Sequence, residues 1–191
     1  MITVVHDPGH GYKGDPGCCH AGIIEANYVL SLAQAIAVGV PSVGHHLLRV
    51  DANGPDYPTR ARRAKELGAD IVLLHHVNAN ESPDCRGLMA FYDHGDLLAA
   101  DVAMAIARAA PTPIFRGIPT IATRLGWPRV LWCLDHYRAL GLSAVLIEWG
   151  FGTSPKDAAY LENPINRPAL IATAAAGLAK AAELKAARLS S

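Results

Sequence analysis

Two histidines and two glutamates occupy places in this sequence where metal-dependent chemistry could be arranged. His10 lies in the glycine-flanked run Asp-Pro-Gly-His-Gly at residues 7–11, and Glu25 follows fifteen positions later. His76 ends an apolar run, and Glu148 ends another. Two imidazoles and one carboxylate are a ligand set of catalytic zinc, because they leave a fourth position for water. The residue types therefore predict Zn²⁺ bound by His10, Glu25 and one histidine of the adjacent pair His75–His76.

Glu148 is predicted to have a different role. It directly follows the apolar residues 145–147. Burial of a carboxylate is costly unless it is hydrogen-bonded, paired with a metal, or used in catalysis. Such surroundings raise a carboxyl pKa toward the range of a general base at neutral pH. The alternative for Glu148 is a salt bridge at the end of a strand.

Each of these residues also has an ordinary structural explanation. His10 alone would be a turn residue, and Glu25 alone would offset the dipole at the start of a helix. His75 and His76 could be one core and one exposed histidine, since adjacent strand residues face opposite sides. The functional prediction depends on all four segments occurring together in one chain.

The elements that must position these residues alternate between strand and helix patterns. Glycine- and proline-rich residues 7–22 and the irregular residues 112–129 are predicted to be loops. Apolar runs and helical periodicity predict strands at residues 2–6, 45–50, 71–75, 87–92 and 144–147, and helices at residues 25–38, 59–67 (capped by Thr59), 96–110, 156–161 and 167–184. This order is typical of the α/β class, with a mostly parallel twisted sheet covered by helices on both faces. We expect residues 1–191 to form a single catalytic domain.

Open parallel sheets gather functional groups where strands end and loops begin. Residues 7–10, residues 75–78 and Glu148 all lie at predicted strand ends, and Glu25 begins the helix after the first loop. These four segments are therefore the places where functional groups are expected.

Composition excludes several other classes of protein. Seventeen basic and 17 acidic residues cancel, so we expect no nucleic-acid partner. No apolar run reaches the roughly 18 residues of a membrane span, so we expect no membrane insertion. Residues 2–5 already have a strand pattern, which predicts that no signal peptide precedes them in this chain. The four cysteines form no Cys-x-x-Cys pair and are predicted to be free thiols.

The ordered motifs resemble a known family of enzymes. The matching features are the Asp-Pro-Gly-His-Gly run, Glu25, an arginine-bearing helix, a His-x-Asn-Ala motif, and a Glu-x-Gly-Phe motif at the end of an apolar strand. In this chain they correspond to residues 7–11, Glu25, Arg60, residues 76–79 and residues 148–151. Together they resemble the zinc-dependent N-acetylmuramoyl-L-alanine amidases of the Amidase_3 family.

This resemblance implies zinc ligands at His10, Glu25 and His76 and a catalytic carboxylate at Glu148. It also implies cleavage of the amide bond between N-acetylmuramic acid and L-alanine in peptidoglycan. The protein would then act on the cell wall, either as a phage endolysin released through a membrane pore or as a secreted host enzyme, and we expect a monomer. Two residues depart from the family pattern, His75 before the ligand and Trp149 after the catalytic Glu148.

Several alternatives remain open from the sequence. One is a zinc peptidase or deacylase that cuts another amide, and another is a non-catalytic wall-binding module. Residues 18–20 (Cys-Cys-His) are interpreted as loop rather than metal site, and His6 as a core or supporting histidine. Trp127, Trp132 and Tyr137 could line a substrate groove or could be packing residues.

Overall fold

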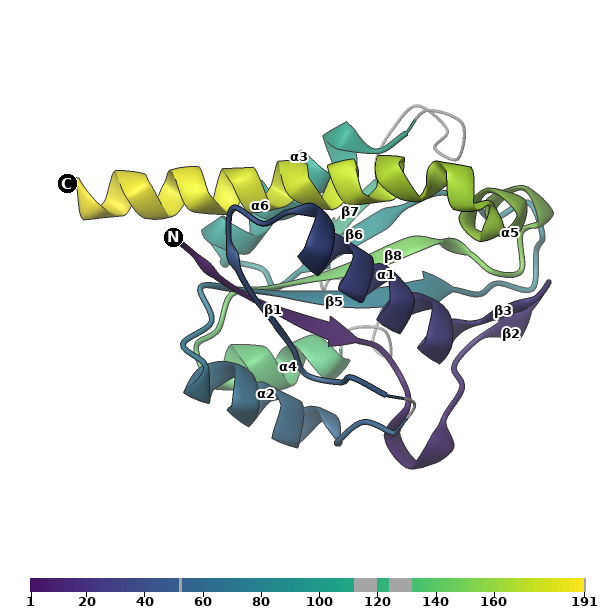
Figure 1. The fold of residues 1–191 in the computed structure, drawn as a ribbon, viewed down its shortest axis with the longest axis horizontal. Coiled ribbons are helices and arrows are strands. Elements are labelled where there is room, and N and C mark those ends of the chain that lie inside the picture. The colour runs from purple at the N-terminus through teal and green to yellow at the C-terminus, as the bar shows by residue number, and fades with distance from the viewer. Residues whose placement is uncertain (52, 112–119, 124–131, 191) are drawn as a thin grey trace.

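The computed structural model describes residues 1–51, 53–111, 120–123 and 132–190, and it has an α/β fold (Figure 1). The described residues form a six-stranded sheet in the order β4-β1-β5-β8-β6-β7, and a separate two-stranded sheet, β2-β3. The strands are Thr3–Pro8 (β1), Cys19–His20 (β2), Ile23–Ile24 (β3), Gly44–Leu47 (β4), Ile71–Asn78 (β5), Met89–Tyr92 (β6), Thr120–Thr123 (β7) and Ala144–Phe151 (β8). Neighbouring strands of the large sheet are parallel except for the β6–β8 pair. This confirms the predicted mostly parallel sheet.

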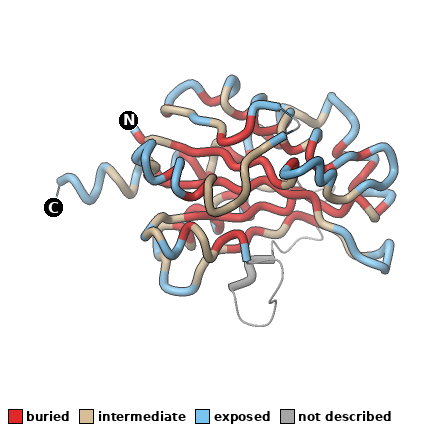
Figure 2. Tube along the Cα trace, turned by 90° about the horizontal axis from the view of Figure 1, so that it is seen from below, coloured by how far each residue is buried: buried red, intermediate tan, exposed pale blue. Residues whose placement is uncertain are grey.

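Helices cover both faces of this sheet, as the sequence predicted. They are Glu25–Gly39 (α1), Tyr57–Glu66 (α2), Leu97–Ala109 (α3), Trp132–Ala139 (α4), Pro155–Glu162 (α5) and Arg167–Leu189 (α6), with short 3₁₀ turns at Tyr12–Gly14 and Pro164–Asn166. Helices α1, α3, α5 and α6 lie on one side of the sheet in Figure 1, and α2 and α4 lie on the other. The end of α6 projects beyond the body of the molecule (Figure 2). None of the described helices combines the length and hydropathy that a membrane span requires.

Two apolar clusters hold the layers together. One contains Val4, Leu73 and Ile147 and packs against α1, α3, α5 and α6. The other contains Val5 and Leu146 and packs against α2 and α4. Adjacent residues of one strand thus belong to different clusters, as the two-residue period of a strand requires. The strands consequently form a buried band through the molecule, which Figure 2 shows in red.

The predicted elements are all present, and the ends of some differ. The helix predicted from a Thr59 cap begins earlier, because Asp56 is the N-cap and accepts a hydrogen bond from the Thr59 backbone N–H at 2.9 Å. A proline in the first turn favours this start, since its missing N–H would have no partner there in any case. The last helix continues to Leu189 rather than ending near residue 184.

Four short elements, β2, β3, β7 and α4, lie where the sequence predicted a loop or no element at all. Thr120–Thr123 forms strand β7 inside the predicted loop 112–129, and the rest of that loop lies outside the described residues. Helix α4, Trp132–Ala139, lies in a segment for which the sequence predicted no element. Cys19–His20 pairs with Ile23–Ile24 as a small hairpin, so residues 18–20 are not simply loop. Two-residue strands leave no alternating pattern by which they could be predicted.

The topology brings the ends of three strands together. Strands β1, β5 and β8 are adjacent and parallel, so their carboxyl ends lie at the same edge of the sheet. His76 on β5 lies directly beside Glu148 on β8 in the strand register. Helix α1 begins at Glu25 near this edge, which places the candidate residues around one point.

Candidate metal centre

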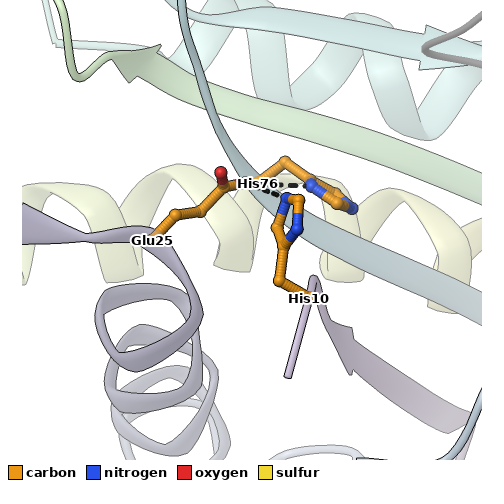
Figure 3. Close-up of side chains that lie close together, drawn as sticks. All are labelled: His10, Glu25 and His76. Atoms are coloured by element: carbon orange, nitrogen blue, oxygen red, sulfur yellow. Dashed lines mark hydrogen bonds and ion pairs between the residues drawn. The ribbon is translucent and has the colours of Figure 1, made fainter. Parts of the chain in front are cut away.

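His10, Glu25 and His76 converge as the sequence predicted. His10 Nε2 lies 3.1 Å from Glu25 Oε1, and His76 Nδ1 lies 3.0 Å from the same oxygen (Figure 3). One potential ligand atom from each of the three side chains lies within 4.8 Å of the others. The three residues come from the loop after β1, the start of α1 and the end of β5, so only the folded chain assembles them.

The geometry of these atoms fits a zinc ion. Tetrahedral ligands about 2.0–2.1 Å from zinc are separated from one another by about 3.3 Å. The two nitrogen–oxygen distances here, 3.1 and 3.0 Å, are close to that spacing. Two imidazoles and one carboxylate also match the donor set of catalytic rather than structural zinc sites. His10, Glu25 and His76 can therefore bind zinc with little rearrangement.

Backbone donors fix the carboxylate of Glu25. Its Oε1 accepts a hydrogen bond from Val77 N–H at 2.9 Å, and its Oε2 accepts one from Cys18 N–H at 2.8 Å. Burial raises the pKa of Glu25, but the hydrogen bonds with His10 and His76 lower it by more than burial raises it. The net pKa therefore lies well below the usual range of a glutamate. Glu25 is thus held ionised, the form that binds a metal.

A second carboxylate orients His10. The Nδ1 atom of His10 lies 2.8 Å from Asp15 Oδ2, which leaves Nε2 directed at Glu25. His10 has a φ of 62°, a left-handed backbone conformation that is uncommon outside glycine. Histidine ligands in metal sites usually donate their other ring N–H to a carboxylate or carbonyl. The contact between Asp15 and His10 has this arrangement, and nothing in the sequence distinguished Asp15 from other loop aspartates.

Two buried arginines hold the loop that contains His10. Arg60 donates to Asp7 Oδ1 at 2.7 Å and to the carbonyl of Pro8 at 2.9 Å, and it also contacts the carbonyl of His10. Arg49 donates to the carbonyl of Gly9 at 3.1 Å. Hydrogen bonds from charged donors are stronger than neutral ones, so this loop has a defined shape. Arg60 was part of the sequence motif, whereas Arg49 has no local signal.

Gly9 and Gly17 leave room for the ligand side chains. A Cβ atom on Gly9 would lie only 2.3–2.7 Å from the imidazole ring of His76. A Cβ on Gly17, whose φ is +68°, would lie 2.6 Å from Glu25 Oε2 and 2.7 Å from the ring of His10. The glycines therefore serve the close approach of the ligands as well as the turn of the loop.

Gly9→Ala should displace His76 and lower the zinc affinity of the folded protein by about 10–100-fold, as changes to the support of a ligand do. Competition with a zinc chelator measures this affinity. Gly44→Ala is the matched control, because its Cβ would meet nothing closer than the Ile2 carbonyl at 3.5 Å. Equal zinc affinity in Gly9→Ala and Gly44→Ala would contradict this account.

Glu148 lies beside the metal ligands but is not one of the three converging residues. It is 6% exposed, and its Oε2 has no hydrogen-bond partner among the described residues. Burial raises the pKa of Glu148 to about 7, with Glu25 adding to the rise and His76 and His10 opposing it. A carboxyl group with this pKa can exchange a proton near neutral pH, as a general base must.

Glu148 and the three ligands line one cavity of about 430 Å³. Tyr57 and the half-exposed Trp132 also line it, with their rings edge to face at 5.4 Å. The full lining is His10, Cys18, Glu25, Tyr57, His76, Val77, Asn78, Ala79, Trp132, Cys133, Leu146 and Glu148. A substrate amide in this cavity would be next to both the ligand set and Glu148.

Some of the remaining sequence predictions are confirmed, and others are not. His75 is fully buried and bonds to His6 and Trp149, so its direction away from the ligand set is confirmed. Trp132 lines the cavity, whereas Tyr137 is buried and donates to Asp7 Oδ2 at 2.6 Å, and Trp127 lies outside the described residues. None of the four cysteines, all of which lie in the part of the chain that the structure describes, forms a disulfide bond, as predicted.

The sequence of this chain is similar to that of a known amidase. LytC of Bacillus subtilis (strain 168), an N-acetylmuramoyl-L-alanine amidase, is 26% identical over 171 residues, which are 85% of this chain and 32% of LytC. The chain therefore spans about a third of the length of that relative.

Solved structures of amidases share the fold. The catalytic domain of CwlV from Bacillus (Paenibacillus) polymyxa var. colistinus has a TM-score of 0.78 and 22% identity, over 96% of this chain and 99% of that one. AmiC2 of Nostoc punctiforme has a TM-score of 0.78 and 24% identity, over 95% of this chain and 97% of that one. The profile of the N-acetylmuramoyl-L-alanine amidase family matches residues 4–180. Since this match includes most of the chain, the protein belongs to the N-acetylmuramoyl-L-alanine amidase family, Amidase_3.

Proposed function

We propose that this chain is a zinc hydrolase that cleaves the amide bond between N-acetylmuramic acid and L-alanine in peptidoglycan. The observation that carries the proposal is the shared cavity, in which two imidazoles and a carboxylate converge next to Glu148. His10, Glu25 and His76 would bind the zinc, and Glu148 would be the catalytic residue. Residues 1–191 would act as a single catalytic domain on the cell wall, as an endolysin or a secreted enzyme.

When bound, zinc would polarise the substrate carbonyl and lower the pKa of water at the site. Glu148 would accept the proton of the attacking water, since its unpartnered Oε2 is free to do so. The same carboxyl would then deliver the proton to the departing alanine nitrogen. Asp15 and the backbone donors to Glu25 would keep the ligands oriented during these steps.

Digestion of purified peptidoglycan by the zinc-loaded protein should release peptides with new N-terminal alanine amines and no new reducing sugar ends. Amide hydrolysis is expected because a glycosidase would need two carboxylates flanking a sugar bond, whereas here Glu25 faces two histidines. Amine labelling and mass spectrometry of the soluble products identify the bond that is cut. The Glu148→Gln protein is the matched control.

The same digestion separates the alternatives. A new amine on a residue other than this alanine would indicate the zinc peptidase or deacylase. Wall binding without any product would indicate a binding module. New reducing ends would indicate a glycosidase and would overturn the proposal.

A further inference from the structure

Four aromatic side chains outside the candidate metal centre, three of them buried and one partly buried, form one continuous hydrogen-bonded chain, which we call the histidine chain. Trp149 Nε1 donates to His75 Nδ1 at 3.2 Å, and His75 Nε2 lies 2.9 Å from His6 Nδ1. His6 Nε2 lies 2.8 Å from His45 Nδ1, and His45 Nε2 lies 2.6 Å from the carbonyl of Val40. The four side chains come from β8, β5, β1 and β4, which are consecutive strands in the sheet.

The two ends of the histidine chain fix the direction of every hydrogen bond in it. The indole N–H of Trp149 can only donate, and the carbonyl of Val40 can only accept. A neutral imidazole has one donor and one acceptor nitrogen, so the donor end requires the proton of His75 on Nε2. The same reasoning places the proton on Nε2 of His6 and then of His45. Starting from the acceptor end gives the same three tautomers.

The histidine chain lies directly behind the candidate metal centre. His75 precedes His76 and Trp149 follows Glu148, and adjacent strand residues face opposite sides of a sheet. Trp149 belongs to the apolar cluster under α1 and α6, whereas Leu146, two residues before Glu148, belongs to the cluster on the other face. A shift of strand β5 or β8 that displaces His75 or Trp149 would thus also displace His76 or Glu148 on the opposite face.

His75 and Trp149 are also the two positions at which the sequence departs from the family pattern. The structure shows that they are partners: their rings are 5.9 Å apart and nearly parallel, at 7°. His6 continues this arrangement, with interplanar angles of 16° to His75 and 26° to His45. The two departures therefore form one interaction, and it lies between the strands of His76 and Glu148.

We propose that His6, His45, His75 and Trp149 are positioning residues, and that their single set of tautomers holds β1, β5 and β8 at the spacing the metal centre requires. A reversed or broken chain would leave two N–H groups or two lone pairs facing each other in the interior, which is costly. The spacing of β1, β5 and β8 at the metal centre therefore depends on the direction of the hydrogen bonds in the histidine chain, on the opposite face of the sheet.

Nitrogen-15 NMR of histidine-labelled wild-type protein tests the tautomers directly and does not depend on the proposed function. We expect His6, His45 and His75 each to carry a proton on Nε2, with Nδ1 as the hydrogen-bond acceptor. The variants His6→Gln, His45→Asn and His75→Gln assign the resonances. A proton on Nδ1 at any of the three positions would overturn the proposal.

Zinc affinity tests the positioning role, and this second readout rests on the proposed zinc site. Trp149→Phe removes the donor and keeps an aromatic ring, and we expect zinc affinity to fall about 10-fold, as for other changes behind a ligand. Ile147→Val is the matched control, because Ile147 is buried on the same face of β8 without belonging to the histidine chain. This control should retain wild-type affinity.

A second pair of variants covers the case in which Trp149→Phe does not fold. His45 lies on the edge strand and is only partly buried, so substitutions there are better tolerated. His45→Asn keeps an acceptor for His6 Nε2 and should retain zinc affinity, whereas His45→Leu removes it and should lower the affinity. Equal affinities in these two variants would overturn the positioning role. Absence of zinc binding in the wild type would instead overturn the proposed function and leave the tautomer test intact.

Discussion

Glu148→Gln should lower turnover by about 10²–10⁴-fold, the usual contribution of a general acid–base group. Glutamine keeps the shape of the side chain but cannot accept a proton from water. Because Glu148 is not among the three converging ligands, the variant should still bind one zinc per chain and unfold at nearly the same temperature. Metal analysis, thermal unfolding and amine release from peptidoglycan measure the three quantities.

Glu183→Gln is the matched control for this substitution, because Glu183 is exposed on α6 and pairs only with Lys180 among the described contacts. The wild-type pH profile gives a further check on the same carboxyl. Burial raises the pKa of Glu148 to about 7, and the active base is the ionised form, so turnover should fall as the pH falls through this pKa. A nearby zinc cation lowers the pKa, so the midpoint of the zinc-loaded protein should lie below 7. Near-wild-type turnover in Glu148→Gln would exclude Glu148 as the base.

His76→Ala should abolish stoichiometric zinc binding, and His10→Ala should have the same effect. Each substitution removes one of three ligands, so the loss of affinity should exceed the 10–100-fold typical of residues behind a ligand. His75→Ala, one residue away, should still bind one zinc per chain when zinc is in excess. Chelator competition and metal analysis of the purified variants measure affinity and stoichiometry.

The control for this comparison is His94→Ala, which removes an exposed histidine far from the cavity lining. It should match the wild type in both measurements. A protein that keeps zinc in His76→Ala but loses it in His75→Ala would show that the assignment of the two adjacent histidines is reversed.

Local sequence patterns were sufficient to predict the layers of this protein. The apolar runs of β1, β5 and β8 and the helical stripe of α1 are each encoded by consecutive residues, so their periodicity is visible in the sequence. The predicted helices and strands are present for this reason. The two-residue strands β2 and β3 were missed because two residues show no repeat. Strand β7 was missed because it lies within residues 112–129, which were predicted to be a loop, and no element was predicted for residues 132–139 of α4.

The candidate ligands His10, Glu25 and His76 and the candidate base Glu148 were also singled out from the sequence, because each lies in a motif at a strand or helix end. Their convergence at 3.0–3.1 Å, however, depends on the adjacency of β1, β5 and β8, which no local pattern specifies.

Tertiary structure alone decided which other residues support the site. The carbonyl of Gly9 accepts from Arg49, His10 contacts Asp15, and Glu25 accepts from the backbone N–H of Cys18. The sequence around Arg49, Asp15 or Cys18 does not reveal these contacts. The same is true of the bond between His75 and Trp149, which joins residues 74 positions apart. Sequence patterns record what each segment buries or exposes, whereas hydrogen bonds between segments depend on the register of the assembled strands.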